Sequence, residues 1–147
     1  MVAGAIIRSM SDLPNADAAR PLRIFVVENH PDTRKYLTMY LEMLGHEVEA
    51  VQTMEAALET IRIHDFDVLI SDIGLPDGDG WELMQRASFR RPIYAIAMSG
   101  FGLGADQVRS KAAGFRHHVL KPFGPDELDS MLEEAAEELA SCAAAAR

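Results

Sequence analysis

The sequence contains very little cysteine and no long hydrophobic run, and each absence excludes a class of protein. Cys142 is the only cysteine among the 147 residues, so the chain forms no internal disulfide and no zinc site of the cysteine–histidine type. No apolar stretch approaches the roughly 20 residues of a membrane-spanning helix, and the apolar run at 2–7 is too short for a secretion signal. These absences fit a reducing compartment, and we expect a cytoplasmic protein without a membrane partner.

Basic residues are also scarce relative to acidic ones. The chain has 14 lysines and arginines against 23 aspartates and glutamates, which gives a formal net charge of −9. This charge disfavours nucleic acid and anionic membranes, because binding to either depends on positive surface charge. We therefore expect no nucleic-acid partner, and a basic protein surface or a metal-bound phosphate instead. The apolar fraction of 48% and the length are typical of one globular domain.

Strand and helix patterns alternate along the middle of the chain. We expect residues 1–20 to be a flexible N-terminal leader, 21–141 to form one domain and 142–147 to be a C-terminal tail. Short apolar runs predict strands at 22–27, 47–51, 67–71, 93–98 and 117–120. Between them, apolar residues recur at helical spacing, and the glycine-containing segments 72–80 and 99–104 are typical of loops.

Local signals mark where the predicted helices begin and end. Pro31 lies in the first turn of the first helix, where its missing N–H costs little, and Gly45 is placed to end that helix. Thr53 is placed to cap the second helix, and Gly114 to end the fourth. Strands that alternate with helices predict an α/β fold, a flavodoxin-like doubly wound (βα)5 sandwich whose parallel five-stranded sheet has the order 2-1-3-4-5.

Polar residues directly follow four of the predicted strands, at the edge where such folds bind ligands. They are Glu28 and Asn29 after the first strand, Asp72 after the third, Ser99 after the fourth and Lys121 after the fifth. Two carboxylates and an amide suit Mg²⁺, an aspartate can act as a nucleophile, and lysine and serine can bind phosphoryl oxygens. Singly, each is explained as a turn former, a helix cap or a surface charge, but together they predict a phosphoryl-transfer site.

Four segments of the chain resemble, in the same order, the receiver domain of two-component response regulators, in particular the chemotaxis-regulator type. The segments are VVENHPDTRKYLTMYLEMLGHEV, DVLISDIGLPDGDGWELM, IAMSGFG and HHVLKPF. The resemblance extends over residues 22–140, which is nearly the whole predicted domain. It implies a protein of two-component or phosphorelay signalling that carries an aspartyl phosphate.

The resemblance also implies a phosphoacceptor and a metal site. Asp72 matches the aspartate that takes a phosphoryl group from the phosphohistidine of a histidine kinase or a histidine phosphotransfer protein. Glu28 and Asn29 match the acidic pair that binds Mg²⁺, the implied cofactor, and Asp72 and the backbone carbonyl of Gly74 complete its ligands. Asn29 stands where aspartate is usual, so we expect Mg²⁺ to bind more weakly than it would to an Asn29→Asp variant.

Three further positions match residues that respond to the phosphoryl group. Ser99 matches the switch hydroxyl, and Lys121 matches the lysine that pairs with the phosphoryl oxygens. The Lys121–Pro122 peptide bond matches one that is usually cis in the family. His118 stands where a switch tyrosine or phenylalanine is usual. It is either an imidazole that changes orientation and gains charge near neutral pH or a strand residue without a switching role.

These assignments predict a phosphorylation-dependent switch, not an enzyme beyond its own phosphotransfer and autodephosphorylation. The kinase or phosphotransfer protein is expected to dock near the first helix. The face formed by the fourth helix, fifth strand and fifth helix is expected to signal to a downstream protein, which the sequence does not name. Residues 125–140 hold seven acidic and no basic side chains, either as a solvated surface or as a docking face for a basic partner.

Several alternatives stay open at the level of the sequence. Met1 and the short leader favour a stand-alone regulator over a receiver taken from a hybrid histidine kinase. Asn29 keeps open a pseudo-receiver that binds partners without being phosphorylated. An aspartyl-phosphate hydrolase would need a second acid where Gly74 stands, and a flavodoxin-like cofactor carrier would need a flavin phosphate loop that the sequence lacks.

Overall fold

One parallel sheet forms the centre of the molecule in the computed structural model, which describes residues 21–100 and 104–145, with side chains through Cys142. Its five strands are β1 (Arg23–Val27), β2 (Glu47–Val51), β3 (Val68–Asp72), β6 (Tyr94–Ser99) and β7 (His117–Leu120). Their order is β2-β1-β3-β6-β7, which confirms the predicted order 2-1-3-4-5, since β6 and β7 are its fourth and fifth strands along the chain. The predicted leader at 1–20 lies outside the described residues.

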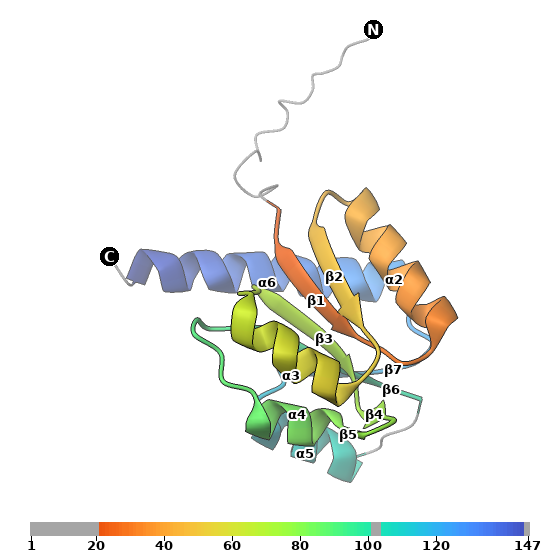
Figure 1. The fold of residues 1–147 in the computed structure, drawn as a ribbon. Coiled ribbons are helices and arrows are strands. Elements are labelled where there is room, and N and C mark those ends of the chain that lie inside the picture. Colours follow the sequence, from red (N-terminus) through yellow and green to blue (C-terminus); the bar gives the residue numbers. More distant parts are fainter. Residues whose placement is uncertain (1–20, 101–103, 146–147) are drawn as a thin grey trace, which may run out of the picture.

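Helices cover both faces of this sheet. The described helices are α2 (Pro31–Met43), α3 (Met54–Ile63), α4 (Gly80–Arg86), α5 (Gly104–Ala113) and α6 (Pro125–Ala145). Leu37 of α2 and Leu128 of α6 pack on one face, and Ala57 of α3 and Leu83 of α4 pack on the other. Figure 1 shows α3 and α4 in front of the sheet and α6 behind it. The arrangement confirms the predicted doubly wound α/β fold.

The burial of each strand follows its amino-acid pattern. Every side chain of β6 is buried, and four of the five residues in β1 and in β3 are buried as well. These continuous apolar runs are typical of strands covered by helices on both faces. The less apolar β2 lies at one edge of the sheet, and four of its five residues are half-buried. Sequence pattern and position in the sheet therefore agree.

Most of the predicted helix ends are confirmed. Pro31 lies in the first turn of α2, and Gly45 follows that helix with φ +98°, a left-handed conformation that glycine adopts without steric cost. The side chain of Thr53 accepts a hydrogen bond from Ala56 N and caps α3. Gly114 follows α5 with φ +115°.

The N-terminus of α2 corrects one interpretation of the sequence. The pair Glu28–Asn29 was an alternative cap for this helix, but the N-cap is His30, whose Nδ1 accepts a hydrogen bond from Thr33 N at 3.4 Å. The helix therefore begins after His30, and the side chains of Glu28 and Asn29 lie beyond the end of β1 and outside the helix. They are available for a different role.

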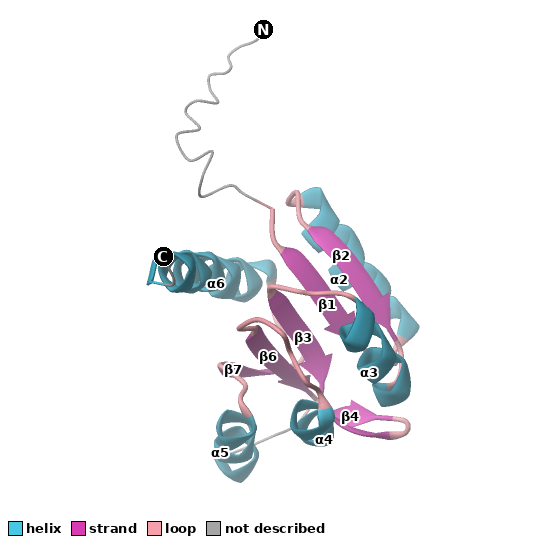
Figure 2. Cartoon of the chain, turned by 60° about the vertical axis from the view of Figure 1, so that its left-hand side comes forward, coloured by secondary structure: helices cyan, strands magenta, loops and turns pink. Residues whose placement is uncertain are grey.

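One segment departs from its predicted structure. The predicted loop at 72–80 contains a small antiparallel pair, β4 (Gly74–Leu75) and β5 (Gly78–Asp79). Figure 2 shows this hairpin beyond the end of β3 and below α3. The predicted loop at 99–104 falls partly on 101–103, outside the described residues. Helix α6 continues past residue 141 to Ala145, and none of the helices within the described ranges has the length and apolar character to cross a membrane.

Candidate functional site

The polar residues predicted from the strand ends, except Ser99, lie in the wall of one cleft. It has a volume of about 630 Å³, and Glu28, Asn29, Asp72, Gly74 and Lys121 all lie in its wall. They come from the carboxyl ends of β1, β3 and β7 and from the residues that follow these strands. Parallel strands bring these ends to one edge of the sheet, so residues far apart in the sequence become neighbours.

Lys121 joins the two carboxylates of this cleft. Its Nζ lies 3.0 Å from Glu28 Oε1 and 3.2 Å from Asp72 Oδ2. The exposed fractions of the three side chains decide what each can do: 1% for Glu28, 13% for Asp72 and 23% for Lys121. Glu28 is thus a buried charge that depends on its partners, whereas Asp72 keeps an accessible face toward the cleft.

This crowding of charge changes the proton affinity of the site. Burial and the nearby Glu28 carboxylate raise the pKa of Asp72 above its usual value, and Lys121 and the Gly74 N–H offset only part of that rise. Burial by itself would lower the pKa of Lys121, but the two carboxylates outweigh it and raise the pKa above its ordinary value. Asp72 therefore lies in an environment that penalises its negative charge.

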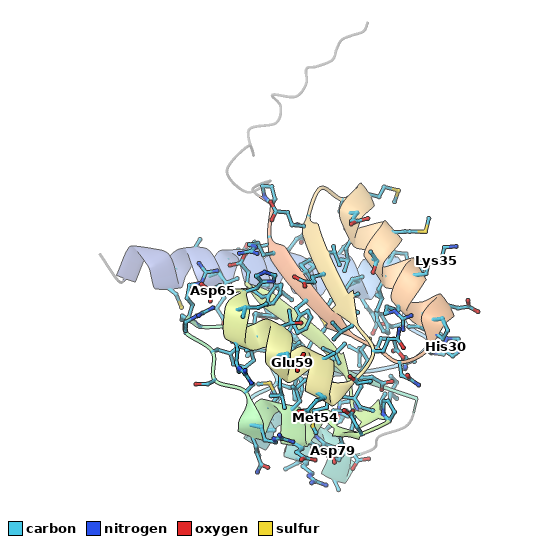
Figure 3. The ribbon with its side chains drawn as sticks, in the orientation of Figure 1. His30, Lys35, Met54, Glu59, Asp65 and Asp79 are labelled. Atoms are coloured by element: carbon cyan, nitrogen blue, oxygen red, sulfur yellow. The ribbon has the colours of Figure 1, made fainter. Side chains whose placement is uncertain are left out.

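Arg34 is a residue of this site that the sequence interpretation missed. Its Nη1 donates to the backbone carbonyls of Glu28 at 2.9 Å and Asn29 at 3.2 Å. The N–H of His30, which Figure 3 labels at the start of α2, donates to Glu28 Oε2 at 2.9 Å. The loop after β1 is therefore held by α2 on one side and by Lys121 on the other. The signal in the sequence is a basic residue one turn into the helix that follows Glu28 and Asn29.

The loop after Asp72 is equally constrained. Asp72 Oδ1 accepts a hydrogen bond from Gly74 N at 3.3 Å. Gly80 N donates to Ile73 O at 2.8 Å, and a Cβ at Gly80 would lie 2.9 Å from Asp72 O. That separation is too short for any residue other than glycine without a backbone shift. The Lys121–Pro122 peptide bond is cis, the isomer that the family resemblance implies.

The residues that line the cleft offer the kinds of oxygen atom that a hard divalent cation prefers. Glu28 and Asp72 have carboxylates, Asn29 has an amide oxygen and Gly74 has a backbone carbonyl. Mg²⁺ prefers oxygen ligands, takes one or two carboxylates and keeps several waters. Within the described part of the chain, no cluster of three or more histidine, cysteine, aspartate or glutamate side chains has metal-binding geometry. With Lys121 included, the side chains carry a net charge of about −1 near neutral pH, which is low for a tight metal site.

Ser99 and His118 lie on β6 and β7, and neither lines the cleft. Ser99 is the last residue of β6 and is buried, and its carbonyl accepts a hydrogen bond from Lys121 N at 2.7 Å. His118 pairs with Ala97 in the register between β7 and β6. The backbone of Ser99 is therefore connected directly to the backbone of Lys121.

His118 belongs to a polar chain that the sequence did not indicate. Trp81 Nε1 on α4 donates to Ser110 Oγ on α5 at 2.9 Å, and Ser110 Oγ lies 2.7 Å from His118 Nδ1. Because Ser110 accepts from Trp81, its own hydroxyl proton can be donated to His118 Nδ1. His118 Nε2 is buried and has no hydrogen-bond partner among the described residues. The guanidinium of Arg109 stacks 4.0 Å from the centre of the Trp81 ring.

The seven acidic residues predicted for the last helix divide into two groups. Three of them bond to side chains on neighbouring elements: Asp129 to the Tyr40 hydroxyl, Glu134 to Tyr94 and His117, and Glu138 to Arg116. The other four are exposed: Asp126, Glu127, Glu133 and Glu137. Part of the acidic character of α6 therefore serves contacts with neighbouring elements, and the remainder makes none of these contacts.

Comparison with known proteins gives a consistent result. The family model for the response regulator receiver domain matches residues 24–133. The chain is 37% identical over 122 residues to the virulence sensor protein BvgS of Bordetella pertussis, and this alignment covers 78% of this chain and 10% of BvgS. It is 30% identical over 112 residues to the KDP operon transcriptional regulatory protein KdpE of Escherichia coli, and this alignment covers 76% of this chain and 50% of KdpE. The chain thus spans from a tenth to half of the length of these relatives.

Solved structures show the same likeness in three dimensions. A CheY-like response regulator receiver domain protein from Methanospirillum hungatei JF-1 has a TM-score of 0.77 and 29% identity, over 83% of this chain and 98% of that chain. The BeF3-activated receiver domain of DrrB has a TM-score of 0.72 and 25% identity, over 80% of this chain and 99% of that chain. The likeness extends over nearly all of each solved domain.

Proposed function

This chain belongs to the response regulator receiver domain family of two-component systems, and we propose that phosphorylation of Asp72 switches it. Receiver domains are signalling switches and not classical enzymes, and the family generally binds Mg²⁺ at the phosphorylation site. The observation that carries the proposal is the position of Asp72 at the end of the central strand β3, in an open cleft and beside Lys121. An accessible carboxylate next to a fixed cation is what an aspartyl nucleophile requires.

The phosphoryl transfer follows from the chemistry of these groups. An oxygen of the Asp72 carboxylate attacks phosphorus, the new O–P bond forms as the N–P bond to the donor imidazole breaks, and the electron pair returns to that nitrogen. Lys121 Nζ lies between the two carboxylates and is positioned to pair with a negatively charged phosphoryl oxygen once that group is attached to Asp72. Mg²⁺, held by Glu28, Asn29, Asp72 and the Gly74 carbonyl, would offset negative charge on the transferring group.

The outer surface of α2 supports the docking of a protein donor beside the cleft. Tyr36, Met39 and Met43 are 46%, 60% and 74% exposed, and they recur at a spacing that places them on one side of the helix. Tyr36 also lines the cleft that contains Asp72. An apolar surface continuous with the phosphoacceptor is suited to a histidine kinase or a histidine phosphotransfer protein, whose helix would cover these side chains.

The response to phosphorylation is proposed to pass through β6 and β7. The phosphoryl group adds about −1.5 to −2 of charge, which attracts the hydroxyl of Ser99 at the end of β6. Ser99 O accepts a hydrogen bond from Lys121 N, directly after β7. His118 lies on β7 and contacts Ser110 of α5. A shift at Ser99 would therefore reach the face formed by α5, β7 and α6, which we propose as the surface read by a downstream protein.

The experiment that tests this function is phosphorylation by a small phosphodonor. Incubation with acetyl phosphate and Mg²⁺ should add one phosphoryl group to the natural chain, detected by intact mass spectrometry, and Asp72→Asn should abolish the addition. Asp65→Asn is a matched control, because Asp65 is a surface ion-pair partner of Arg90 and its carboxylate should not matter.

Failure of the natural chain to gain mass would contradict the proposal. It would support a pseudo-receiver that binds its partner without phosphorylation, for which Asn29 is the structural argument. A mass increase that persists in Asp72→Asn would show that another residue is modified. Omitting Mg²⁺ should reduce the yield, because Lys121 alone compensates the negative charges of the phosphoryl group and of the two carboxylates incompletely.

Replacing His118 by phenylalanine tests the switch position through stability. We expect His118→Phe to raise the free energy of unfolding by about 1 kcal/mol, because it removes a buried nitrogen that has no hydrogen-bond partner in the described part of the chain. Ser110 keeps its hydrogen bond from Trp81. Urea unfolding of both proteins at the same pH measures the difference. A lower stability of the phenylalanine variant would show that the Ser110–His118 hydrogen bond outweighs the unpaired nitrogen.

A further inference from the structure

The carboxylate of Asp77 makes an unusual pair of contacts at the tip of the β4–β5 hairpin. Its Oδ1 accepts a hydrogen bond from Met54 N at 2.8 Å, and its Oδ2 accepts one from Glu55 N at 2.9 Å. Both oxygens of this exposed side chain thus accept hydrogen bonds from the backbone of α3, which lies more than 20 residues earlier in the sequence. Figure 3 labels Met54 at the start of α3 and Asp79 at the end of the hairpin.

The first turn of α3 is capped by two separate groups. A helix N-terminus presents N–H groups that have no partner within the helix. The side chain of Thr53 accepts from Ala56 N at 3.1 Å, which is the ordinary N-cap contact. Asp77 satisfies the two preceding N–H groups, and these hydrogen bonds hold the pKa of Asp77 below its usual value. Thr53 belongs to the segment before α3, whereas Asp77 belongs to the loop that follows the phosphoacceptor.

The hairpin connects Asp77 to Gly74. Its strands pair Gly74 with Asp79 and Leu75 with Gly78, so Asp77 at the tip and Gly74 at the base belong to one short ladder. The base is fixed on α4, because Asp79 Oδ1 accepts from Glu82 N at 2.7 Å. The tip is fixed on α3 by Asp77. Gly74 N in turn donates to Asp72 Oδ1.

The hairpin also packs closely against the start of α3. A Cβ at Gly78 would lie 2.7 Å from the Sδ and Cε atoms of the Met54 side chain. The hairpin can approach α3 this closely because Gly78 has no side chain, and the approach brings the Asp77 carboxylate within reach of the helix N–H groups. The contact between the hairpin and α3 therefore depends on two neighbouring residues, Asp77 and Gly78.

We propose that Asp77 is a positioning residue for the phosphorylation site, which anchors the loop after β3 to α3 and so holds the Gly74 carbonyl and the Asp72 carboxylate in place for Mg²⁺. This inference rests on the proposed function, since it concerns the same site. Asp77 itself would touch neither metal nor phosphoryl group. It acts as outer partners of metal ligands do, by fixing the orientation of the atoms that bind.

A pair of matched variants of the full chain tests this role. Asp77→Ala and Thr53→Ala each remove side-chain acceptors from the N-terminus of α3, so both should lower the melting temperature. Only Asp77 connects α3 to the hairpin. Titration calorimetry with MgCl₂ should therefore show about tenfold weaker binding in Asp77→Ala and an unchanged dissociation constant in Thr53→Ala. Asp77→Asn, which keeps one oxygen acceptor, should fall between Asp77→Ala and the natural chain.

A second measurement on the metal-free proteins separates this inference from the proposed function. Amide hydrogen exchange at Gly74 and along 73–79 should become faster in Asp77→Ala but not in Thr53→Ala, whether or not Mg²⁺ binds. If the natural chain binds no Mg²⁺, the proposed metal site fails, and the exchange rates decide the role of Asp77. If exchange and Mg²⁺ affinity in Asp77→Ala equal those of Thr53→Ala, Asp77 is only a helix cap, and the inference is wrong.

Discussion

Replacement of Lys121 by methionine should lower the free energy of unfolding at pH 7 by about 3 kcal/mol, because breaking a buried ion pair leaves a buried charge uncompensated. Glu28 is 1% exposed, and Lys121 Nζ is 3.0 Å from its carboxylate. The same substitution removes the cation beside Asp72. Methionine retains most of the apolar length of lysine, so the loss reports charge and not packing volume. Urea unfolding without Mg²⁺ measures it.

The loss should depend on pH with a definite sign. The pKa of Asp72 is already raised by burial and by Glu28, and removing Lys121 should raise it further. A carboxyl group whose pKa is higher in the folded state binds more protons there, so its contribution lowers stability as pH rises from about 4 through the folded pKa. The gap between Lys121→Met and the natural chain should therefore narrow as the pH falls toward 4.

A surface lysine provides the control for this measurement. Lys111 is exposed near the end of α5, and Lys111→Met should change the free energy of unfolding by no more than about 0.5 kcal/mol. Mg²⁺ should recover more stability in Lys121→Met than in the natural chain. A bound cation stabilises the folded state by mass action, and in the variant it also replaces the positive charge of Lys121. If Lys121→Met behaved like Lys111→Met at every pH, Glu28 would not depend on Lys121.

Replacing Asn29 by aspartate should have the largest effect on metal affinity. We expect Asn29→Asp to bind Mg²⁺ about tenfold more tightly, because affinity for such cations rises with the number of charged ligands in the site. Asn29 lies in the wall of the cleft together with Glu28 and Asp72. The added carboxylate should also lower the stability of the metal-free protein, since a third negative charge joins the site.

Gln52→Asp is the matched control for charge alone. Gln52 is exposed just after β2, so its substitution adds one negative charge to the same edge of the sheet without a new ligand in the cleft. Titration calorimetry should show Mg²⁺ affinity close to that of the natural chain. Equal affinity in Asn29→Asp and the natural chain would show that the amide at this position costs nothing, and that another group dominates the metal site.

The amino-acid sequence by itself determined the architecture and most of the residues in the cleft. Apolar runs and helical spacing are local properties, so the strands at 47–51 and 117–120 could be predicted with the bounds that the structure has. Alternation of strands and helices restricts the sheet to a few topologies. In a parallel sheet the carboxyl ends meet at one edge, and this rule placed Glu28, Asp72 and Lys121 together before any contact was known.

Only the tertiary structure decided how that cleft is held. Three sets of side-chain hydrogen bonds leave no periodic pattern in the sequence. They are those of Asp77 to the backbone of α3, of Arg34 to the carbonyls after β1, and from Trp81 through Ser110 to His118. A side-chain hydrogen bond needs its atoms within a few tenths of an ångström of the right separation. Strand order and helical spacing specify neighbours far more coarsely. The sequence thus determines which residues share the cleft, and packing between distant segments determines which atoms bond.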